Sequence, residues 1–470
     1  MKETYLLSVD LGTSFIKAAA YDLSGVQHAI MQVSVENDTS QAGIFIQSGE
    51  EIYHSVLSAL RGISRQLGEK VNQIAAICFT GQMAGFMGAG PHWEDVTSWS
   101  CSLDTRYAPY VERQIAMCGD DFLEISGTNA PVMAPKISWL MHNFPEQEAN
   151  TAKYMLISSY IAGRLGESDI EEAAVSSSYA TWTGLADIRK KSWSEELCGR
   201  LGIPVEKLPR IVNYHTIVGK LSKAAAKAVS LPSGIPLAAG AGDKIAGCIG
   251  AGILSAGDVT FKASSYAAVS VLTDSYRPNP ERKDYDAIPA MEDGQFYLHR
   301  YFPGSGITLQ WFIDNFCGTE RSSNRIFKEI ESLTEKVPLG SEGLLAVGML
   351  GGSAMPFDGK LRGAWVGHSW NHRKEHFYRA LLEGFSYELA LTLDSIKTMY
   401  PEWNRASDIV LTGGGANSAV WARILADVTG AYALRTDGTK EYLLFHTYEI
   451  CMNYLGRDEL CRGPERCYHK

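Results

Sequence analysis

Short apolar runs separated by polar turns dominate the pattern of this chain, and their spacing predicts both strands and helices. The run Tyr5–Val9 is apolar and ends at Asp10, which is typical of a buried strand. A second apolar run, 15–21, stops at the turn residues 22–25 and is too short for an ordinary helix, so it predicts a returning strand. Apolar residues spaced three and four apart between residues 50 and 67 predict an amphipathic helix instead.

The turn of this first predicted hairpin carries Gly12, Thr13 and Ser14. Backbone N–H and hydroxyl groups in such a turn can bind phosphate, and the carboxylate of Asp10 can face a metal. The same residues would also suit an ordinary hairpin. A second stretch, 258–272, repeats the order of apolar strand, hydroxyl-rich turn and apolar strand. Two such hairpins, one in each half, indicate a duplicated fold that binds a nucleotide.

Three further apolar runs end in glycine-rich loops, the usual place for ligand contacts in α/β proteins. The run 74–79 leads into Thr80-Gly-Gln82-Met83-Ala-Gly85, where the Gln82 amide can bond hydroxyl groups or simply sit in a glycine turn. The run 235–239 leads into Gly-Ala-Gly and delivers Asp243 to the start of a helix, as a cap or as a catalytic carboxylate. The run 409–412 ends in three glycines, which let the backbone approach a ligand closely.

Composition narrows the class of protein. The 470 residues suffice for two domains, and a net charge of −10 disfavours nucleic acid and anionic membranes as partners. The nine cysteines form no CxxC pair, so neither a disulfide framework nor a zinc ribbon is indicated. No signal peptide or membrane-length apolar stretch is visible, and we expect a soluble cytoplasmic protein.

Taken in order, these stretches resemble the FGGY carbohydrate kinases of the actin/Hsp70/sugar-kinase superfamily, over roughly residues 4 to 430. The segment from Trp99 to Arg106 resembles the family's Trp-x-Asp-x-Arg segment, and 306–311 resembles its Gly-x-x-x-Gln-Trp stretch. The resemblance implies an α/β fold of two duplicated actin-like (ribonuclease H-like) domains with an interdomain cleft. The N-terminal domain, 1–243, would bind sugar and carry the first phosphate hairpin. The C-terminal domain, 244–470, would bind the nucleotide.

The resemblance also implies residue roles, with ATP and Mg²⁺ as cofactors. Asp243 would be the general base that takes the proton of the attacking sugar hydroxyl. Asp10 and Asp243 would face the metal, and the sugar would contact Gln82, Met83, Asp104 and Asp243. The nucleotide would contact Gly12, Thr13, Ser14, Lys17, Ser264, Ser265, Gly306, Gln310, Gly414, Gly415, Asn417 and Ser418.

Departures from the family bear on the substrate. Ala84 replaces the histidine of the Gly-Gln-Met-His-Gly loop of xylulokinases, and serines at 158, 159 and 176–178 are expected to alter the rim of the sugar pocket. The substrate expected first is a pentulose such as xylulose or ribulose, with a hexulose or a small polyol as the alternative.

Three matters stay open at this stage. Lys244 can reach a phosphate or point outward, and a homodimer is one option for the assembly. From about residue 433 the chain lacks the family's small-residue helix, which keeps open a sugar or nucleotide sensor that has lost turnover.

Overall fold

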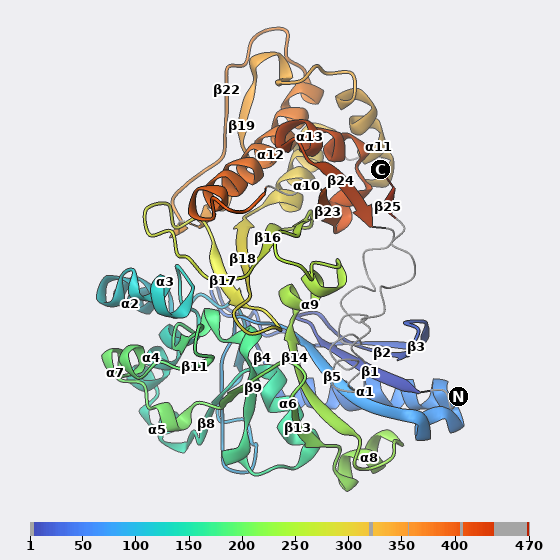
Figure 1. Ribbon diagram of the computed structural model, residues 1–470, viewed down its shortest axis with the longest axis vertical. Helices are drawn as coiled ribbons and strands as arrows, with labels where there is room; N and C mark the ends of the chain where they lie inside the picture. The colour runs from blue at the N-terminus through green and yellow to red at the C-terminus, as the bar shows by residue number, and fades with distance from the viewer. Residues whose placement is uncertain (1–3, 319–322, 356, 405–407, 437–467, 470) are drawn as a thin grey trace. The chain divides into compact units, whose positions relative to one another are not determined.

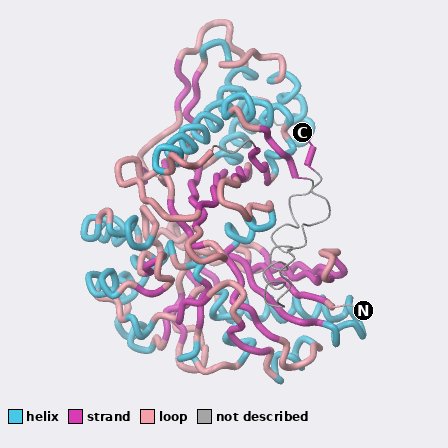
Figure 2. The backbone as a smooth tube through the Cα atoms, viewed as in Figure 1, coloured by secondary structure: helices cyan, strands magenta, loops and turns pink. Residues whose placement is uncertain are grey.

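A computed structural model gives the fold of the protein (Figure 1). It describes residues 4–318, 323–355, 357–404, 408–436 and 468–469, so most of the atypical tail lies outside the described residues. The chain divides into two compact units. Unit 1 comprises residues up to 250 together with 288–295, and unit 2 comprises 251–287 with the described residues from 296 onward. Both units combine a mixed sheet with helices, which confirms the predicted α/β class (Figure 2).

The sheet of unit 1 has six strands in the order β13-β14-β5-β1-β2-β3. The central strands β14, β5 and β1 are parallel, and every other neighbouring pair is antiparallel. All seven residues of β1 are buried, as expected for a central strand. The strands are β1 (Tyr5–Leu11), β2 (Phe15–Asp22), β3 (Gln27–Ser34), β5 (Ile74–Gly81), β13 (Ile217–Lys220) and β14 (Pro236–Gly242).

Helix α1 (Gly49–Leu67) matches the helix predicted for residues 50–67 and packs on β2 and β3. It begins where the Ser48 hydroxyl accepts the backbone N–H of Glu51, and it ends at Gly68. Unit 1 also contains α2 (Ala108–Cys118), α3 (Asp121–Ser126), α4 (Met133–Asn143), α5 (Pro145–Asn150), α6 (Ile157–Gly166), α7 (Glu195–Leu201), α8 (Lys223–Val229) and α9 (Asp243–Gly250). Its short strand pairs are β4 (Ile46–Gln47) with β7 (Trp99–Ser100), β6 (Met87–Ala89) with β8 (Lys153–Met155), β9 (Ala174–Ser176) with β12 (Arg210–Val212), and β10 (Ala186–Asp187) with β11 (Ser192–Trp193).

The sheet of unit 2 repeats this plan. Its strands follow the order β17-β18-β16-β15-β23-β24-β25. From β18 to β25, the five neighbouring pairs are in turn antiparallel, antiparallel, parallel, parallel and antiparallel. The five neighbouring pairs from β3 to β13 in unit 1 follow the same series. The duplication predicted from two hairpins is therefore confirmed. The strands are β15 (Val259–Lys262), β16 (Ala267–Thr273), β17 (Asp286–Pro289), β18 (Phe296–Phe302), β23 (Asp408–Thr412), β24 (Tyr432–Thr436) and β25 (Tyr468–His469).

The longest helix of unit 2 among the described residues, α12, packs against α13 and α11. In α10, Trp311 is 36% exposed, whereas the two residues that follow it, Phe312 and Ile313, are buried. Neighbouring residues point about 100° apart on a helix, so Trp311 lies at the margin of the apolar face that holds Phe312 and Ile313. The elements are α10 (Ser305–Phe316), α11 (Ser323–Thr334), α12 (Lys374–Met399), α13 (Ala419–Thr429), β19 (Leu345–Val347), β20 (Ser353–Ala354), β21 (Phe357–Asp358) and β22 (Ala364–Val366).

Within the part of the chain that the structure describes, no helix has the length and apolar character needed to cross a membrane.

Candidate functional site

Three predicted site residues lie at one edge of the unit 1 sheet. Asp10 is near the carboxyl end of β1, Gln82 directly follows β5, and Asp243 directly follows β14. These strands are adjacent and parallel, and Gly81 is paired with both Leu11 and Gly242. The carboxyl ends of neighbouring parallel strands meet at one edge, where α/β proteins place ligand contacts. The fold thus brings together residues that are separated by up to 233 positions in the chain.

The first turn, residues 12–14, joins β1 to β2. Asp10 is 4% exposed and lies opposite Lys17 in the hairpin, with 3.9 Å between its Oδ2 and the lysine Nζ. A Cβ at Gly12 would lie 2.7 Å from the carbonyl oxygen of Phe15, so the turn closes tightly only with glycine there. Ser14 is exposed, and Gly12 and Thr13 are partly exposed. This turn can present N–H and hydroxyl donors to an anion.

Asp243 is the first residue of α9, and its carboxylate contacts the neighbouring lysine. Lys244 Nζ lies 2.9 Å from Asp243 Oδ2, a contact that is neither of the two arrangements considered for this lysine. The backbone N–H of Gly242 donates to the Ser178 hydroxyl at 3.0 Å, which holds the end of β14 in place. Ser178 therefore supports the backbone that carries Asp243, a role that the sequence did not indicate.

The serines that depart from the family were expected to alter the rim of the sugar pocket, and in the structure they are buried. Ser158, Ser159 and the run 176–178 are all at most 4% exposed. Tyr179, which follows them, is buried as well, and burial raises the pKa of its phenol. The negative charges of Asp243 and Asp10 raise this pKa further, because a phenolate would be repelled by both. Of these buried residues, Ser178 holds the strand end that carries Asp243, and Tyr179 is close enough to feel the charge of both carboxylates.

The Gln82 loop, residues 80–85, packs against the end of β14. A Cβ at Gly242 would lie 2.3 Å from Cγ of Met83, so the methionine occupies the space that glycine leaves. Met83 is 5% exposed, whereas Gln82 is partly exposed. The amide of Gln82 is bonded to Trp99 and Gln47. Of the two predicted sugar contacts in this loop, Gln82 is the one that can meet a ligand without rearrangement.

Asp104 is buried at 1% exposure, and both carboxylate oxygens already accept hydrogen bonds. Arg106 donates from Nε to Oδ1 at 2.9 Å and from an η nitrogen to Oδ2 at 2.6 Å, and the Ser100 hydroxyl donates to Oδ2 at 2.8 Å. Burial tends to raise the pKa of Asp104, but the bonds from Arg106 and Ser100 hold this pKa below its usual value. The geometry makes Asp104 an anchor of the 99–106 segment.

Lys136 of α4 lies beneath this segment and was not among the predicted site residues. Its Nζ is 2.7 Å from the carbonyl oxygen of Ser100, 2.9 Å from the Ser100 hydroxyl and 2.6 Å from the carbonyl oxygen of Cys101. Burial lowers the pKa of Lys136 to about 7, partly opposed by the charge of Asp104. The sequence feature that could have indicated its role is the presence of a lysine within the otherwise apolar run 132–137.

This lysine makes stability depend on pH. Its native pKa lies below the ordinary value of 10.5, so between about pH 7 and 10.5 the unfolded chain binds more protons than the native protein. The contribution of Lys136 to the free energy of unfolding therefore rises with pH over this range. We expect Lys136→Met to destabilise the protein by about 1–3 kcal/mol, because three buried oxygens each lose one of their hydrogen-bond partners. The difference from the wild type should be larger at pH 9.5 than at pH 7, as measured by chemical denaturation. A difference that shrinks as pH rises would contradict the lowered pKa.

Three predicted elements of unit 2 meet at the second turn, residues 263–266. The N–H of Gly306, at the start of α10, donates to the carbonyl oxygen of Ser264 at 3.0 Å. The N–H of Gly415 donates to the carbonyl oxygen of Ala263 at 2.8 Å. Gly413 has φ of +83°, and a Cβ there would lie 2.5 Å from that same oxygen. The fold therefore brings together Ser264, Ser265, Gly306, Gly414 and Gly415.

The other residues of unit 2 predicted to contact the nucleotide are Gln310, Asn417 and Ser418. Gln310 is exposed one turn further along α10 and donates to Asp314 at 2.7 Å, and Asn417 is exposed. Ser418 is buried and caps α13 by accepting the N–H of Trp421 at 3.0 Å, while its hydroxyl donates to Glu331 of α11. Burial raises the pKa of Glu331, and the bond from Ser418 opposes this. Glu331 is a neighbour of the glycine turn that the sequence did not single out.

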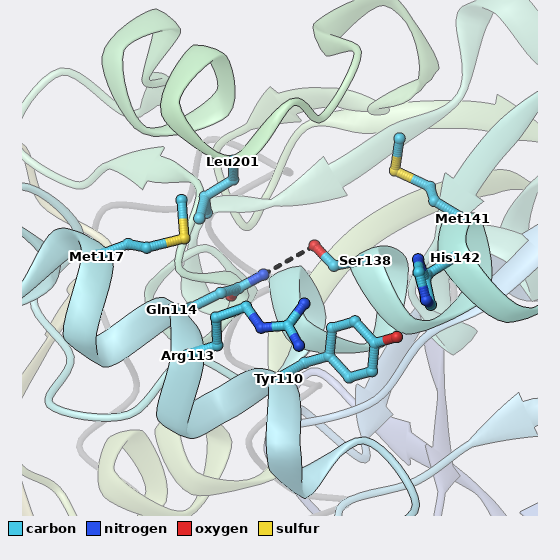
Figure 3. Close-up of a pocket in the computed structure, with 8 residues that line it drawn as sticks. All are labelled: Tyr110, Arg113, Gln114, Met117, Ser138, Met141, His142 and Leu201. Atoms are coloured by element: carbon cyan, nitrogen blue, oxygen red, sulfur yellow. Dashed lines mark hydrogen bonds between the residues drawn. The ribbon is translucent and has the colours of Figure 1, made fainter.

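A pocket of about 330 Å³ lies elsewhere in unit 1, between α2, α4 and α7 (Figure 3). Its polar walls include Gln114, whose Nε2 donates to the Ser138 hydroxyl at 2.8 Å, and Arg113 beside the ring of Tyr110. None of the predicted site residues lines it. It is therefore distinct from the sheet edge that carries Asp10, Gln82 and Asp243.

Comparisons with known proteins give the family. The sequence model of the N-terminal domain of the FGGY family of carbohydrate kinases matches residues 5–250, and that of the C-terminal domain matches residues 266–443. The chain is 26% identical to a xylulose kinase of Bacillus subtilis over 441 residues, covering 92% of this chain and 85% of that protein. It is 25% identical to a gluconokinase of the same organism over 436 residues, covering 90% and 83%.

The fold comparison agrees. The crystal structure of a gluconate kinase from Lactobacillus acidophilus superposes with a TM-score of 0.88 at 21% identity, covering 98% of this chain and 91% of the other. Two family models in the right order, with 424 of the 470 residues in their matched ranges (246 plus 178), go well beyond any single motif. The protein belongs to the FGGY family of carbohydrate kinases, which are phosphotransferases that act on sugars.

Proposed function

We propose that this kinase transfers the γ-phosphoryl group of ATP to a hydroxyl of a ketose, with a pentulose such as xylulose or ribulose as its first substrate. Residues 1–243 would bind the sugar, and 244–470 would bind the nucleoside. The observation that carries this proposal is the shared sheet edge of unit 1. There a carboxylate for the metal, an amide for the sugar and a carboxylate for the proton follow three adjacent parallel strands.

Asp243 would orient the attacking hydroxyl and accept its proton. Phosphoryl transfer asks little covalent chemistry of the protein, so positioning and charge stabilisation provide most of the rate enhancement. A base at the start of α9 follows Gly242, which is held by the Ser178 hydroxyl and packs against Met83, so its backbone has a defined position. In this proposal Lys244 holds the carboxylate in place through its 2.9 Å contact.

The residues of both turns fit a nucleoside triphosphate. Gly12 and Gly306 are sites where a Cβ would collide with backbone, so glycine keeps both turns compact. Thr13, Ser14, Lys17, Ser264 and Ser265 would add donors to the phosphates, with Gln310, Gly414, Gly415, Asn417 and Ser418 beside the nucleoside.

Mg²⁺ would be held by few protein ligands. Among the described residues, no group of three or more His, Cys, Asp or Glu side chains is placed to hold a metal. Mg²⁺ commonly keeps waters and binds one or two carboxylates with substrate phosphates, so Asp10, with Asp243 as the second candidate, suffices for the protein side. The bound ion would neutralise charge that develops on the phosphates.

The choice of substrate rests on Gln82, Met83 and the similarity to a xylulose kinase. Ala84 lacks the histidine of typical xylulokinases, which keeps a hexulose or a small polyol as alternatives. The similarity to a gluconokinase adds an aldonic acid to the compounds worth testing. A sensor without turnover, suggested by the atypical sequence from about residue 433, is the contrasting hypothesis.

A coupled assay of ADP release, with MgATP and a panel of pentuloses, hexuloses, polyols and gluconate, tests the proposal. We expect the highest kcat/KM with a pentulose. Glycerol as the best substrate would overturn the ranking of substrates. Absence of turnover across the panel, with sugar binding still detected by calorimetry, would establish the sensor in place of the kinase.

A further inference from the structure

Three side chains of unit 1 form a hydrogen-bonded series between the Gln82 loop and the first turn. Gln47 of β4 lies opposite Trp99 of β7 in an antiparallel pair. The indole N–H of Trp99 donates to Oε1 of Gln82 at 3.1 Å, and Nε2 of Gln82 donates to Oε1 of Gln47 at 3.0 Å. Nε2 of Gln47 in turn donates to the carbonyl oxygen of Thr13 at 2.8 Å. The series thus links residues 82 and 13 through a side chain that no motif singled out.

Chemistry allows only one direction for this series. An indole N–H can only donate, so the oxygen of the Gln82 amide must face Trp99. A backbone carbonyl can only accept, so the NH₂ group of Gln47 must face Thr13. Flipping either amide would place two donors or two acceptors against each other. The indole N–H of Trp99 at one end and the carbonyl of Thr13 at the other therefore fix the orientations of both amides.

Because Gln47 and Trp99 are buried, losing a hydrogen bond of this series is costly. Gln47 is 2% exposed and Trp99 is 0% exposed, so water cannot replace a lost partner at either residue. The indole also packs on the loop itself, since a Cβ at Gly85 would lie 2.1 Å from Cζ2 of Trp99. The backbone N–H of Gln82 donates to the carbonyl oxygen of Leu11 at 3.1 Å, which ties the loop to the end of β1 as well.

The bond to Thr13 has a consequence for the next residue. In a planar trans peptide the carbonyl and the following N–H point in opposite directions. Gln47 holds the carbonyl of Thr13, so it also sets the direction of the N–H of Ser14, away from Gln47. That N–H belongs to the first turn, where phosphate donors are proposed.

We propose that Gln47 is a positioning residue that couples carbohydrate binding at Gln82 to the orientation of the phosphate-binding turn. The inference rests on the proposed function of both sites. With Oε1 engaged by Trp99 and one N–H by Gln47, the second N–H of Gln82 is the donor left for a ligand. We therefore expect the carbohydrate to offer an oxygen acceptor to this N–H. Engagement of that N–H strengthens the series, because linked hydrogen bonds polarise one another.

The test compares Mg·ADP affinity with and without carbohydrate by calorimetry, together with kcat and both KM values. In the wild type, the best compound of the panel should tighten Mg·ADP binding by a factor in the usual range of about 5–150. Gln47→Leu should reduce this factor to about 1 and raise the KM for ATP. Gln66→Leu is the matched control, because the Gln66 amide also bonds backbone, donating to Ile30 at 2.9 Å and accepting at 3.2 Å, away from the site. A coupling factor that survives in Gln47→Leu would overturn the proposal.

A second variant gives a signature that lost packing alone would not produce. The ionised side chain of Gln47→Glu accepts from Gln82 but cannot donate to Thr13, whereas its protonated form can do both. The KM for ATP of Gln47→Glu should therefore fall toward the wild-type value as pH is lowered through the pKa of the introduced carboxyl group. Wild type and Gln66→Leu should show no such trend. A pH profile of Gln47→Glu parallel to that of the wild type would count against the proposal.

Failure of the proposed function is separable from failure of this inference. If no compound of the panel is phosphorylated, the proposed function fails. Binding of Mg·ADP alone still tests the role of Gln47. Loss of about tenfold in that affinity in Gln47→Leu and not in Gln66→Leu would support the positioning role. Equal affinities in the two variants, with both proteins folded by thermal melting, would overturn it.

Discussion

Replacing Asp243 by asparagine is expected to lower kcat by on the order of 10²–10⁴-fold, the usual contribution of a general base. The asparagine keeps the shape of the side chain and can still bond a sugar hydroxyl, but it cannot accept the proton. The KM for the sugar should therefore change much less than kcat. Steady-state kinetics with the best compound of the panel, followed by calorimetric binding of the same compound, measures both effects.

Stability separates this catalytic role from a structural one. Loss of a helix cap costs roughly 1 kcal/mol, whereas a carboxylate that serves catalysis can be removed with little change in melting. Asp293→Asn is a suitable control, since that carboxylate is 89% exposed and belongs to the same unit. An Asp243→Asn protein that melts early yet turns over normally would show that Asp243 is structural, and the proposed mechanism would be wrong.

Replacing Gly306 by alanine is expected to raise the KM for ATP by about 10–100-fold. The added Cβ would lie 2.6 Å from the carbonyl oxygen of Ser264 and 3.0 Å from Cα of Ser265, both backbone atoms that cannot swing aside. Either α10 or the second turn must shift, which weakens the bonds from Gly306 to Ser264 and from Ile307 to Ser265. Two misplaced backbone hydrogen bonds correspond to about 1–3 kcal/mol, and 1.4 kcal/mol is a tenfold change in affinity.

The stability of Gly306→Ala is a useful second readout. Alanine is favoured over glycine within a helix by up to about 1 kcal/mol, which offsets part of the clash. Binding should therefore suffer more than melting temperature. Gly351→Ala is the matched control, because a Cβ there meets nothing within 4 Å and its φ is ordinary. A normal KM for ATP in Gly306→Ala, together with a lowered melting temperature, would mean that the second turn does not bind the nucleotide.

Local pattern was enough to predict the elements and their repetition. The apolar run before Asp10 became β1, the helical spacing of residues 50–67 became α1, and Asp243 begins α9 as expected. The two hairpins also indicated a duplication, which the matching strand directions confirm. These features depend on neighbours within one or two elements, so the periodicity of a single stretch contains the information.

Tertiary structure decided which side chains support the candidate site. Lys136 meets the 99–106 segment, Ser178 meets Gly242, and Gln47 meets both Gln82 and Thr13, across separations of 34 to 64 residues. It also buried the serines that depart from the family and left Trp311 partly exposed. Periodicity shows which face of an element is buried, but it does not show which distant group lies against that face. Those partners follow from the pairing of strands far apart in the chain, and hydrogen-bonding groups buried by that pairing must then find one another.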